Sequence, residues 1–290
     1  MSNILCSTRV LLIWEKPPWA HTGKRPVLGA IALLAFLVVG CTGPRFENGV
    51  SIGTGKNGAN SLTIPVPPST DEEASGDLLI SILGVQANPN TQEPEGWTTV
   101  RGFAGFNGAT CAADTEGTAC QLAIYYRIAD GSETSITIDW GVQRHAAGAV
   151  LRYSNVDQAA PIGQTSQRRG SSNKPTAPVI NTSRDGSRIM RIAVAEMDDA
   201  MTFLEGTLVL TGGPRSLRVN LVSFPDAETD PAAGCGPPLS GCRETENAVA
   251  LSVSDEGKGS AGGSGTASWD LPAGDQWLTA SFEIRGAVND

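Results

Sequence analysis

Apolar and polar residues alternate along several short stretches of the chain, which is the pattern of a half-buried β-strand. In the stretch 122–128 every second residue is Leu, Ile or Tyr, and Ile136, Ile138 and Trp140 repeat the pattern. Similar reasoning predicts further strands at 62–66, 77–85, 97–103, 148–153, 178–182, 189–195, 207–210, 217–222, 248–253 and 278–284. The chain is therefore expected to contain about a dozen strands.

Turn-forming residues separate these stretches. Asp130-Gly131 and Asp185-Gly186 tolerate the positive φ that a sheet reversal requires. No stretch alternates a strand with a helix of 10–15 residues, which disfavours a parallel α/β sheet. We expect an all-β fold, an antiparallel β-sandwich of jelly-roll type, with no substantial helix outside the N-terminal leader. The glycine-rich stretch 256–265 is expected to be a mobile loop, and no internal repeat is evident.

A basic and then apolar leader precedes the strand-rich body. Lys24 and Arg25 come before the apolar run 27–39, and Gly43 and Pro44 follow it. This is the layout of a secretory signal. The run is shorter than the ~20 apolar residues that a transmembrane helix needs, so an uncleaved anchor is the weaker alternative, as is an ordinary secretory signal.

The leader ends in Leu37-Val38-Val39-Gly40-Cys41, which resembles the lipobox of bacterial lipoproteins. The resemblance implies cleavage before Cys41, a diacylglyceryl thioether on its sulfur and a fatty acid on the new amino group. It further implies export and lipid anchoring to the cell envelope, with Thr42 favouring the outer membrane. We accordingly expect a signal segment at 1–40, a tether and entry strand at 41–60 and a β-sandwich domain at 61–290.

Composition limits the partners of this body. The chain carries a net charge of −9, and removal of the more basic leader makes it more acidic. No run of Lys or Arg could neutralise a row of phosphates, so we expect no nucleic-acid partner. The 34 Gly, 18 Pro and 6% aromatic residues fit short strands joined by turns.

Cysteines are expected to form disulfides in an oxidising compartment. One of the six lies in the leader and Cys41 would be lipidated, which leaves Cys111, Cys120, Cys235 and Cys242. Three pairings are open, of which Cys111–Cys120 and Cys235–Cys242 each close a short polar loop. A zinc site is disfavoured because no C-x₂-C pair exists, and we expect no metal at these cysteines.

Catalytic groups are sparse in the sequence. His145 is the only histidine after the leader, and no nucleophile elbow accompanies it, which disfavours nucleophilic hydrolysis. Glu196-Met197-Asp198 partly resembles the E-x-D-x-x-E strand of family 16 glycoside hydrolases, but the last glutamate of that motif is missing. We therefore expect no enzyme.

Two further patterns could bind a ligand. Core packing is the more usual role of the tryptophans. Among them Trp269, which lies beside the glycine-rich stretch, is the best candidate for an exposed ligand-contact residue, because an indole ring can stack on a sugar. Asp226, Glu228 and Asp230 could coordinate calcium from a loop, although Pro231 stands where an EF-hand needs glycine. No other cofactor is expected.

Short signatures in the body resemble a β-sandwich module of phage tail and bacterial surface proteins. They include Gly76-Asp77-Leu78-Leu79, Gly96-Trp97-Thr98, Tyr125-Tyr126-Arg127 and Tyr153-Ser154-Asn155. The resemblance covers about residues 60–287 and implies a fold and a surface setting, without catalytic residues. We expect a non-catalytic binding or adhesion module for a glycan or protein ligand. An envelope-structural or phage-derived appendage component and a glycoside hydrolase are the alternatives, and the oligomeric state is open.

Overall fold

The computed structural model describes one strand-built body. The described residues are 43–54, 58–70, 75–87, 89–100, 103, 109–111, 120–197, 209–211, 215–223, 248–271 and 276–287. Within them the chain forms 18 strands and no helix, which confirms the all-β sandwich. The strands outnumber the dozen expected because several contain only two residues. No helix in this part is long and apolar enough to cross a membrane.

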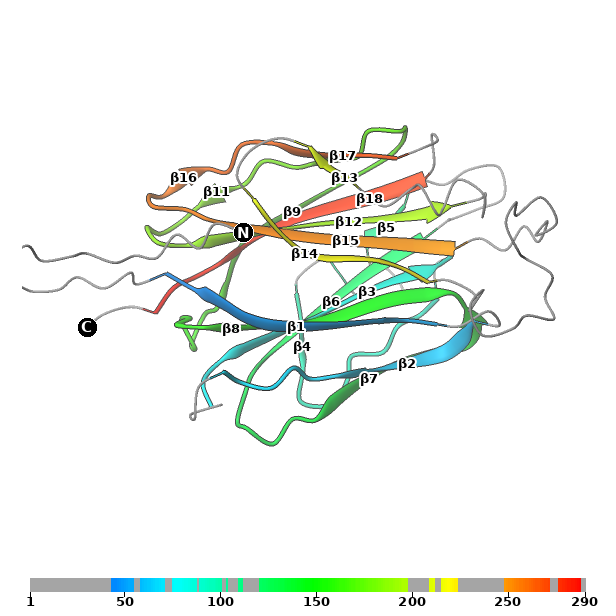
Figure 1. Cartoon of the computed structure of the whole chain (residues 1–290), viewed down its shortest axis with the longest axis horizontal. Helices are drawn as coiled ribbons and strands as arrows, with labels where there is room; N and C mark the ends of the chain where they lie inside the picture. The colour runs from blue at the N-terminus through cyan, green and yellow to red at the C-terminus, as the bar shows by residue number, and fades with distance from the viewer. Residues whose placement is uncertain are drawn as a thin grey trace, which may run out of the picture. The chain divides into compact units, whose positions relative to one another are not determined.

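Two antiparallel inner sheets face each other at the centre of the body (Figure 1). The first sheet has the order β1 (Arg45–Gly53), β8 (Ala146–Ser154), β3 (Leu78–Gln86), β6 (Cys120–Ile128) and β4 (Thr98–Thr99), with β5 (Ala109–Thr110) also on β6. The second has the order β14 (Ser216–Val222), β15 (Ala248–Gly257), β12 (Arg188–Met197), β18 (Gln276–Ile284) and β9 (Ile162–Ser171). Apolar residues from both sheets form the largest core between them.

An outer layer covers the far side of each inner sheet. Over the first sheet, β2 (Ala59–Pro65) pairs with β7 (Ser135–Arg144). Over the second lie two small sheets, β10 (Thr176–Ala177) with β17 (Ala267–Asp270) and β13 (Val209–Thr211), and β11 (Asn181–Thr182) with β16 (Gly262–Gly263). The central strands are therefore buried on both faces. This explains why β3 reads as a nearly continuous apolar run, Leu-Leu-Ile-Ser-Ile-Leu.

The two halves of the body share one topology. The order β1-β8-β3-β6 in the first sheet corresponds strand by strand to β9-β18-β12-β15 in the second. The pair β2–β7 likewise corresponds to β10–β17 in chain order. A bulge recurs at the same register, opposite Arg152 of β8 and opposite Glu283 of β18. The structure thus contains an internal repeat that the sequence does not reveal.

Two segments differ from expectation. β1 pairs with β8 along its length, so the strand-built body starts at Gly43, before the expected boundary at residue 61. The stretch 256–265 was expected to be a mobile loop, but part of it is held by backbone pairing. Its Gly262 and Gly263 pair with β11, and the Lys258 N–H donates to the Ser187 carbonyl. These are backbone hydrogen bonds, which need no apolar side chain. The leader 1–40 and Cys41 lie outside the described residues.

Candidate binding cleft

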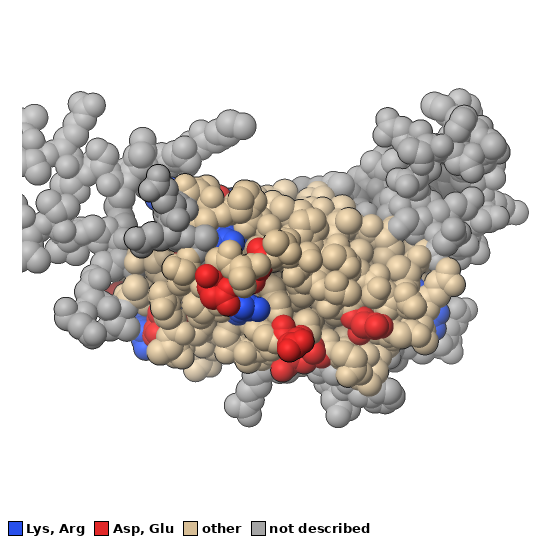
Figure 2. All heavy atoms as spheres, turned by 90° about the horizontal axis from the view of Figure 1, so that it is seen from below, with Lys and Arg blue, Asp and Glu red and all other residues tan. Residues whose placement is uncertain are grey.

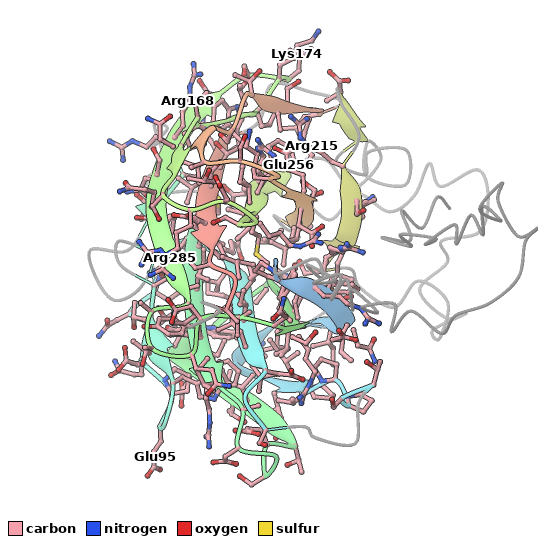
Figure 3. The ribbon with its side chains drawn as sticks, turned by 90° about the vertical axis from the view of Figure 1, so that its left-hand side faces the viewer. Glu95, Arg168, Lys174, Arg215, Glu256 and Arg285 are labelled. Atoms are coloured by element: carbon pink, nitrogen blue, oxygen red, sulfur yellow. A yellow bond between two sulfur atoms is a disulfide. The ribbon has the colours of Figure 1, made fainter. Side chains whose placement is uncertain are left out.

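The two sides of the sandwich close differently. On one side β1, the edge strand of the first sheet, lies against the seven-residue β14 of the second sheet. On the other side the edge strand is β9, and the strands of the first sheet that end there are β4 and β5, with two residues each. In Figure 3, β1 and β14 lie to the right and β9 to the left. Among the described residues, the β9 side is the less covered of the two.

A cleft of about 700 Å³ lies on the β9 side. One wall is the stretch 162–167 of β9, followed by Arg285 after β18. The other wall comes from the first sheet and consists of Thr99, Val100, Phe103 and Tyr126. The described lining thus offers hydroxyl and amide groups, two aromatic rings and one guanidinium, and it contains no carboxylate, histidine or cysteine. Such a lining can bind and orient a polar ligand, and it supplies no acid–base pair.

The shape of the cleft wall depends on the bulge in β9. Gly163 stands at this bulge, and a Cβ atom there would collide with the carboxylate of Glu283. Glu283 is fully buried on β18 and accepts hydrogen bonds from the Ser183 N–H (2.8 Å) and the Gln164 N–H (3.3 Å). The carboxylate therefore joins the start of β9 to the loop before β12.

Glu283 also positions the cation of the cleft. Burial raises the pKa of this carboxyl group, but hydrogen bonds from Ser187 and Ser183 outweigh burial and leave the pKa below its ordinary value. The carboxylate is therefore charged at neutral pH and lies 3.8 Å from Nε of Arg285. Since Nε of Arg285 also donates to Ser183 Oγ at 3.2 Å, the guanidinium is held at the cleft from two directions.

An ion cluster fills the equivalent place on the β1 side. Asp255 is fully buried and accepts hydrogen bonds from the Tyr153 hydroxyl (2.7 Å), from Arg188 (2.8 Å) and twice from Arg218 (both 2.9 Å). The Arg218 guanidinium lies 4.0 Å from the centre of the Phe46 ring. Burial, and then the charge of Asp255, raise the pKa of Tyr153 well above its usual value, so its hydroxyl remains a donor.

The repeat register explains why one side is filled and the other is open. Tyr126 pairs with Ile80 of β3 as Asp255 pairs with Met190 of β12. Tyr126 thus stands where the second half has its buried carboxylate. Strands β4 and β5 contribute only Thr and Ala where β14 contributes Arg218. The β9 side therefore has no counterpart of the Arg–Asp–Arg cluster in its described residues, and the space remains a cleft.

The structure corrects the expectation for Trp269. Its side chain is fully buried, and its indole N–H donates to Ser252 Oγ at 3.1 Å. The reason is the outer layer, because β17 places Trp269 against the second inner sheet in a cluster of alanines that includes Ala193 and Ala250. Trp140, on β7 of the other outer layer, packs in the same way against the first inner sheet. Neither ring is available for stacking on a ligand.

The cysteines are placed only in part. Cys111 and Cys120 form a disulfide, with their Cα atoms 5.0 Å apart and both side chains buried. Cys235 and Cys242 lie outside the described residues, as do the proposed calcium ligands Asp226, Glu228 and Asp230. In the part of the chain that is described, no three His, Cys, Asp or Glu side chains gather as a metal site would require.

Comparison with known proteins adds no functional information. No family model matches the chain, and no match was found among curated proteins or solved structures.

The sequence pattern does not predict the residues that line the cleft. β9 reads Ile-Gly-Gln-Thr-Ser-Gln-Arg-Arg-Gly-Ser and lacks apolar alternation, because an edge strand beside a polar cleft buries little. Its one sequence signal is the pair of adjacent arginines.

Proposed function

We propose that this protein is a non-catalytic binding module that is held at a bacterial cell envelope through a lipidated Cys41. The observation that carries the binding role is the cleft beside β9. Its hydroxyl and amide groups can exchange hydrogen bonds with a sugar, and the half-buried ring of Tyr126 supplies aromatic surface. Because no carboxylate is found among the described lining residues, binding is better supported than glycoside hydrolysis.

Binding is tested with a glycan array and a matched pair of variants. Gln167 is exposed on β9 at the cleft, and Ser51 is exposed at the equivalent register of β1, opposite Ala149 as Gln167 is opposite Ala280. In Q167W the indole would occupy the cleft, whereas S51W adds the same ring on the filled side. We expect the wild type and S51W to bind a common glycan and Q167W to lose at least tenfold in affinity. Unchanged binding by Q167W, or no binding by the wild type, contradicts the proposal.

The anchor is supported by the lipobox and by the early start of the body at Gly43, which leaves a short tether after Cys41. Intact-mass spectrometry of the purified protein tests it. We expect the mass of a chain that begins at Cys41 and carries a diacylglyceryl group and a fatty acid. We also expect Cys41→Ser to remain unlipidated with its leader attached. A bare sulfur in the wild type contradicts the anchor.

A structural role at the envelope is the second candidate, and the edge strands favour it. β1 has nine residues and β9 has ten, and each is paired along only one of its sides in the described sheets. Long edge strands can pair between copies. Sedimentation velocity tests the second candidate. We expect self-association at micromolar concentration if the edge strands pair between copies, and a monomer under these conditions contradicts it.

A further inference from the structure

Positive charge gathers along β9 in a protein that is otherwise acidic. Arg168 and Arg169 are exposed on this strand, and exposed Lys174 follows it. None of the three forms an ion pair with a described residue. Figure 3 shows Arg168 and Arg285 on the same side of the molecule, with Lys174 beyond Arg168. Seen from below, by contrast, acidic side chains are more prominent than basic ones (Figure 2).

Most other arginines of the described part are neutralised within the fold. Those with a carboxylate partner within 4 Å are Arg45, Arg127, Arg152, Arg184, Arg188, Arg191, Arg215, Arg218 and Arg285. The remaining unpaired cations, Arg144 and Lys258, lie on β7 and after β15, away from β9 in the sequence. Among the described residues the β9 cations are therefore an exception to a general pattern of internal pairing, and no carboxylate of this part of the chain neutralises them.

The position of these cations relates them to the cleft. Arg285 donates its backbone N–H to Pro161, at the start of the cleft wall 162–167, and Arg168 comes directly after the end of that wall. A strand rises about 3.3 Å per residue, so residues 162 and 167, at the two ends of the wall, are about 17 Å apart. The neutral hydroxyl and amide groups of Thr165, Ser166 and Gln167 lie along this wall.

Building on the proposed function, we infer that the cleft binds an acidic polysaccharide that runs along β9. Carboxylates of the polymer would meet the unpaired cations Arg168, Arg169 and Lys174 at one end, where Arg169 shares the face of Gln167. At the other end Arg285, whose charge is already balanced by Glu283, would add hydrogen-bond donors. The ring hydroxyls of the polymer would meet the neutral groups of the cleft. A nucleic acid fits less well, because its phosphates follow one another closely and the cleft wall itself carries no cation between its two ends.

The experiment compares two polymers and two charge-reversal variants of the mature chain. We measure affinity for alginate, a polyuronate, and for dextran of similar length, which is neutral. The double variant R168E/R169E reverses the β9 charges, and R144E reverses an exposed, unpaired arginine on β7. We expect tighter binding of alginate than of dextran, about a tenfold loss of alginate affinity in R168E/R169E and no change in R144E. Alginate affinity should also fall as salt rises.

Each outcome separates this inference from the proposed function. Equal binding of alginate and dextran, with loss of both in Q167W, overturns the acidic ligand and leaves a glycan-binding cleft. Equal losses in R168E/R169E and R144E also overturn it, because the effect would then be nonspecific. If neither polymer nor any glycan binds, both proposals fail. Tighter binding to a single-stranded DNA oligonucleotide or to phosphatidylglycerol vesicles than to alginate replaces the carboxylate ligand with a phosphate ligand.

Discussion

Asp255 connects the two halves of the protein through side chains from three other strands, β8, β12 and β14. It is fully buried, and it forms ion pairs with Arg188 and Arg218 while accepting a hydrogen bond from the Tyr153 hydroxyl. In D255N the two guanidinium groups lose their counter-ion, so we expect the free energy of unfolding to fall by about 3–5 kcal/mol. Y153F, which removes one donor and no charge, should cost only about 1–2 kcal/mol. Urea unfolding of both variants tests this ranking, and an equal loss contradicts it.

Glu283 is expected to make the free energy of unfolding fall as the pH becomes acidic. Its pKa in the folded protein is below the ordinary 4.5, because the hydrogen bonds from Ser187 and Ser183 outweigh the opposing effect of burial. A carboxyl group with a lowered pKa contributes stability that is present above its unfolded pKa and is lost as the pH falls through the folded pKa. E283Q should therefore be less stable than the wild type at pH 7.

The same variant should also lose less stability than the wild type as the pH falls from above 4.5 through the lower pKa that Glu283 has in the folded protein. Urea unfolding at several pH values measures the two curves. Other carboxylates with lowered pKa, such as Asp157 and Glu47, titrate in both proteins and cancel in the difference. Parallel curves would show that Glu283 does not contribute to the acid sensitivity.

Single residues show where reasoning from the sequence succeeds and fails. The Cys111–Cys120 bridge follows from nearness in the chain and an expected oxidising compartment. The exposure of Trp269 was inferred from its glycine-rich neighbours. Those neighbours form backbone pairs with β11, and the layer that they belong to covers the indole. Local composition does not indicate which layer will lie over a residue, since that depends on pairing between segments far apart in the chain.

At the scale of elements, the disulfide joins β5 to the start of β6. It closes a loop with a sequence separation of nine, and the Cys111 N–H also donates to the Cys120 carbonyl. In the chain-entropy model, such a closure stabilises by about 2–3 kcal/mol. C111S/C120S should lose this amount in urea unfolding. Reducing agent should lower the free energy of unfolding of the wild type by at least as much. If the reducing agent leaves this free energy unchanged, the prediction is wrong.

The strands were predictable where one face or both faces are apolar, and less so where charges are paired. The sequence pattern ends the strand that starts at Ala248 near Val253, because Asp255 and Glu256 follow. In the structure β15 continues to Gly257, since Arg188 and Arg218 neutralise Asp255 and Arg191 and Arg215 neutralise Glu256. β9 was missed for a related reason, because its polar residues line the cleft or contact solvent. The candidate site was therefore less visible in the sequence than the core.

At the scale of the whole body, there is a physical reason why the sequence pattern does not reveal the repeat. The two halves need the same strand order and the same alternation of buried and exposed positions. Many different apolar residues can occupy the buried positions, so the two sequences need not be similar. Corresponding positions on β8 and β18 are Tyr153 and Ile284, and those on β6 and β15 are Tyr126 and Asp255. The difference at the second pair accompanies one open side and one filled side. The repeat therefore constrains topology while leaving each edge free to acquire its own chemistry.

The ends of the body meet at the link between the halves, which predicts that the chain tolerates circular permutation. Asn155 donates through Nδ2 to the Gly43 carbonyl (2.9 Å), and its own carbonyl accepts the Ala287 N–H (3.1 Å). A linker of about five Gly and Ser residues can join these ends. New termini between exposed Gln158 and Ala159 interrupt a link that contains no strand, so we expect folding with a loss of about 1–2 kcal/mol.

A permutant opened at Gly84 provides the control, because this residue lies in β3, pairs with both β6 and β8, and faces Val194 of the other sheet. It should not fold. Circular dichroism and urea unfolding compare the two permutants. We expect one cooperative transition for the permutant opened after Gln158, since the largest core draws residues from both halves and neither half can bury its inner face alone. Two separate transitions would show that each half folds independently and that the ion cluster at Asp255 joins two preformed units.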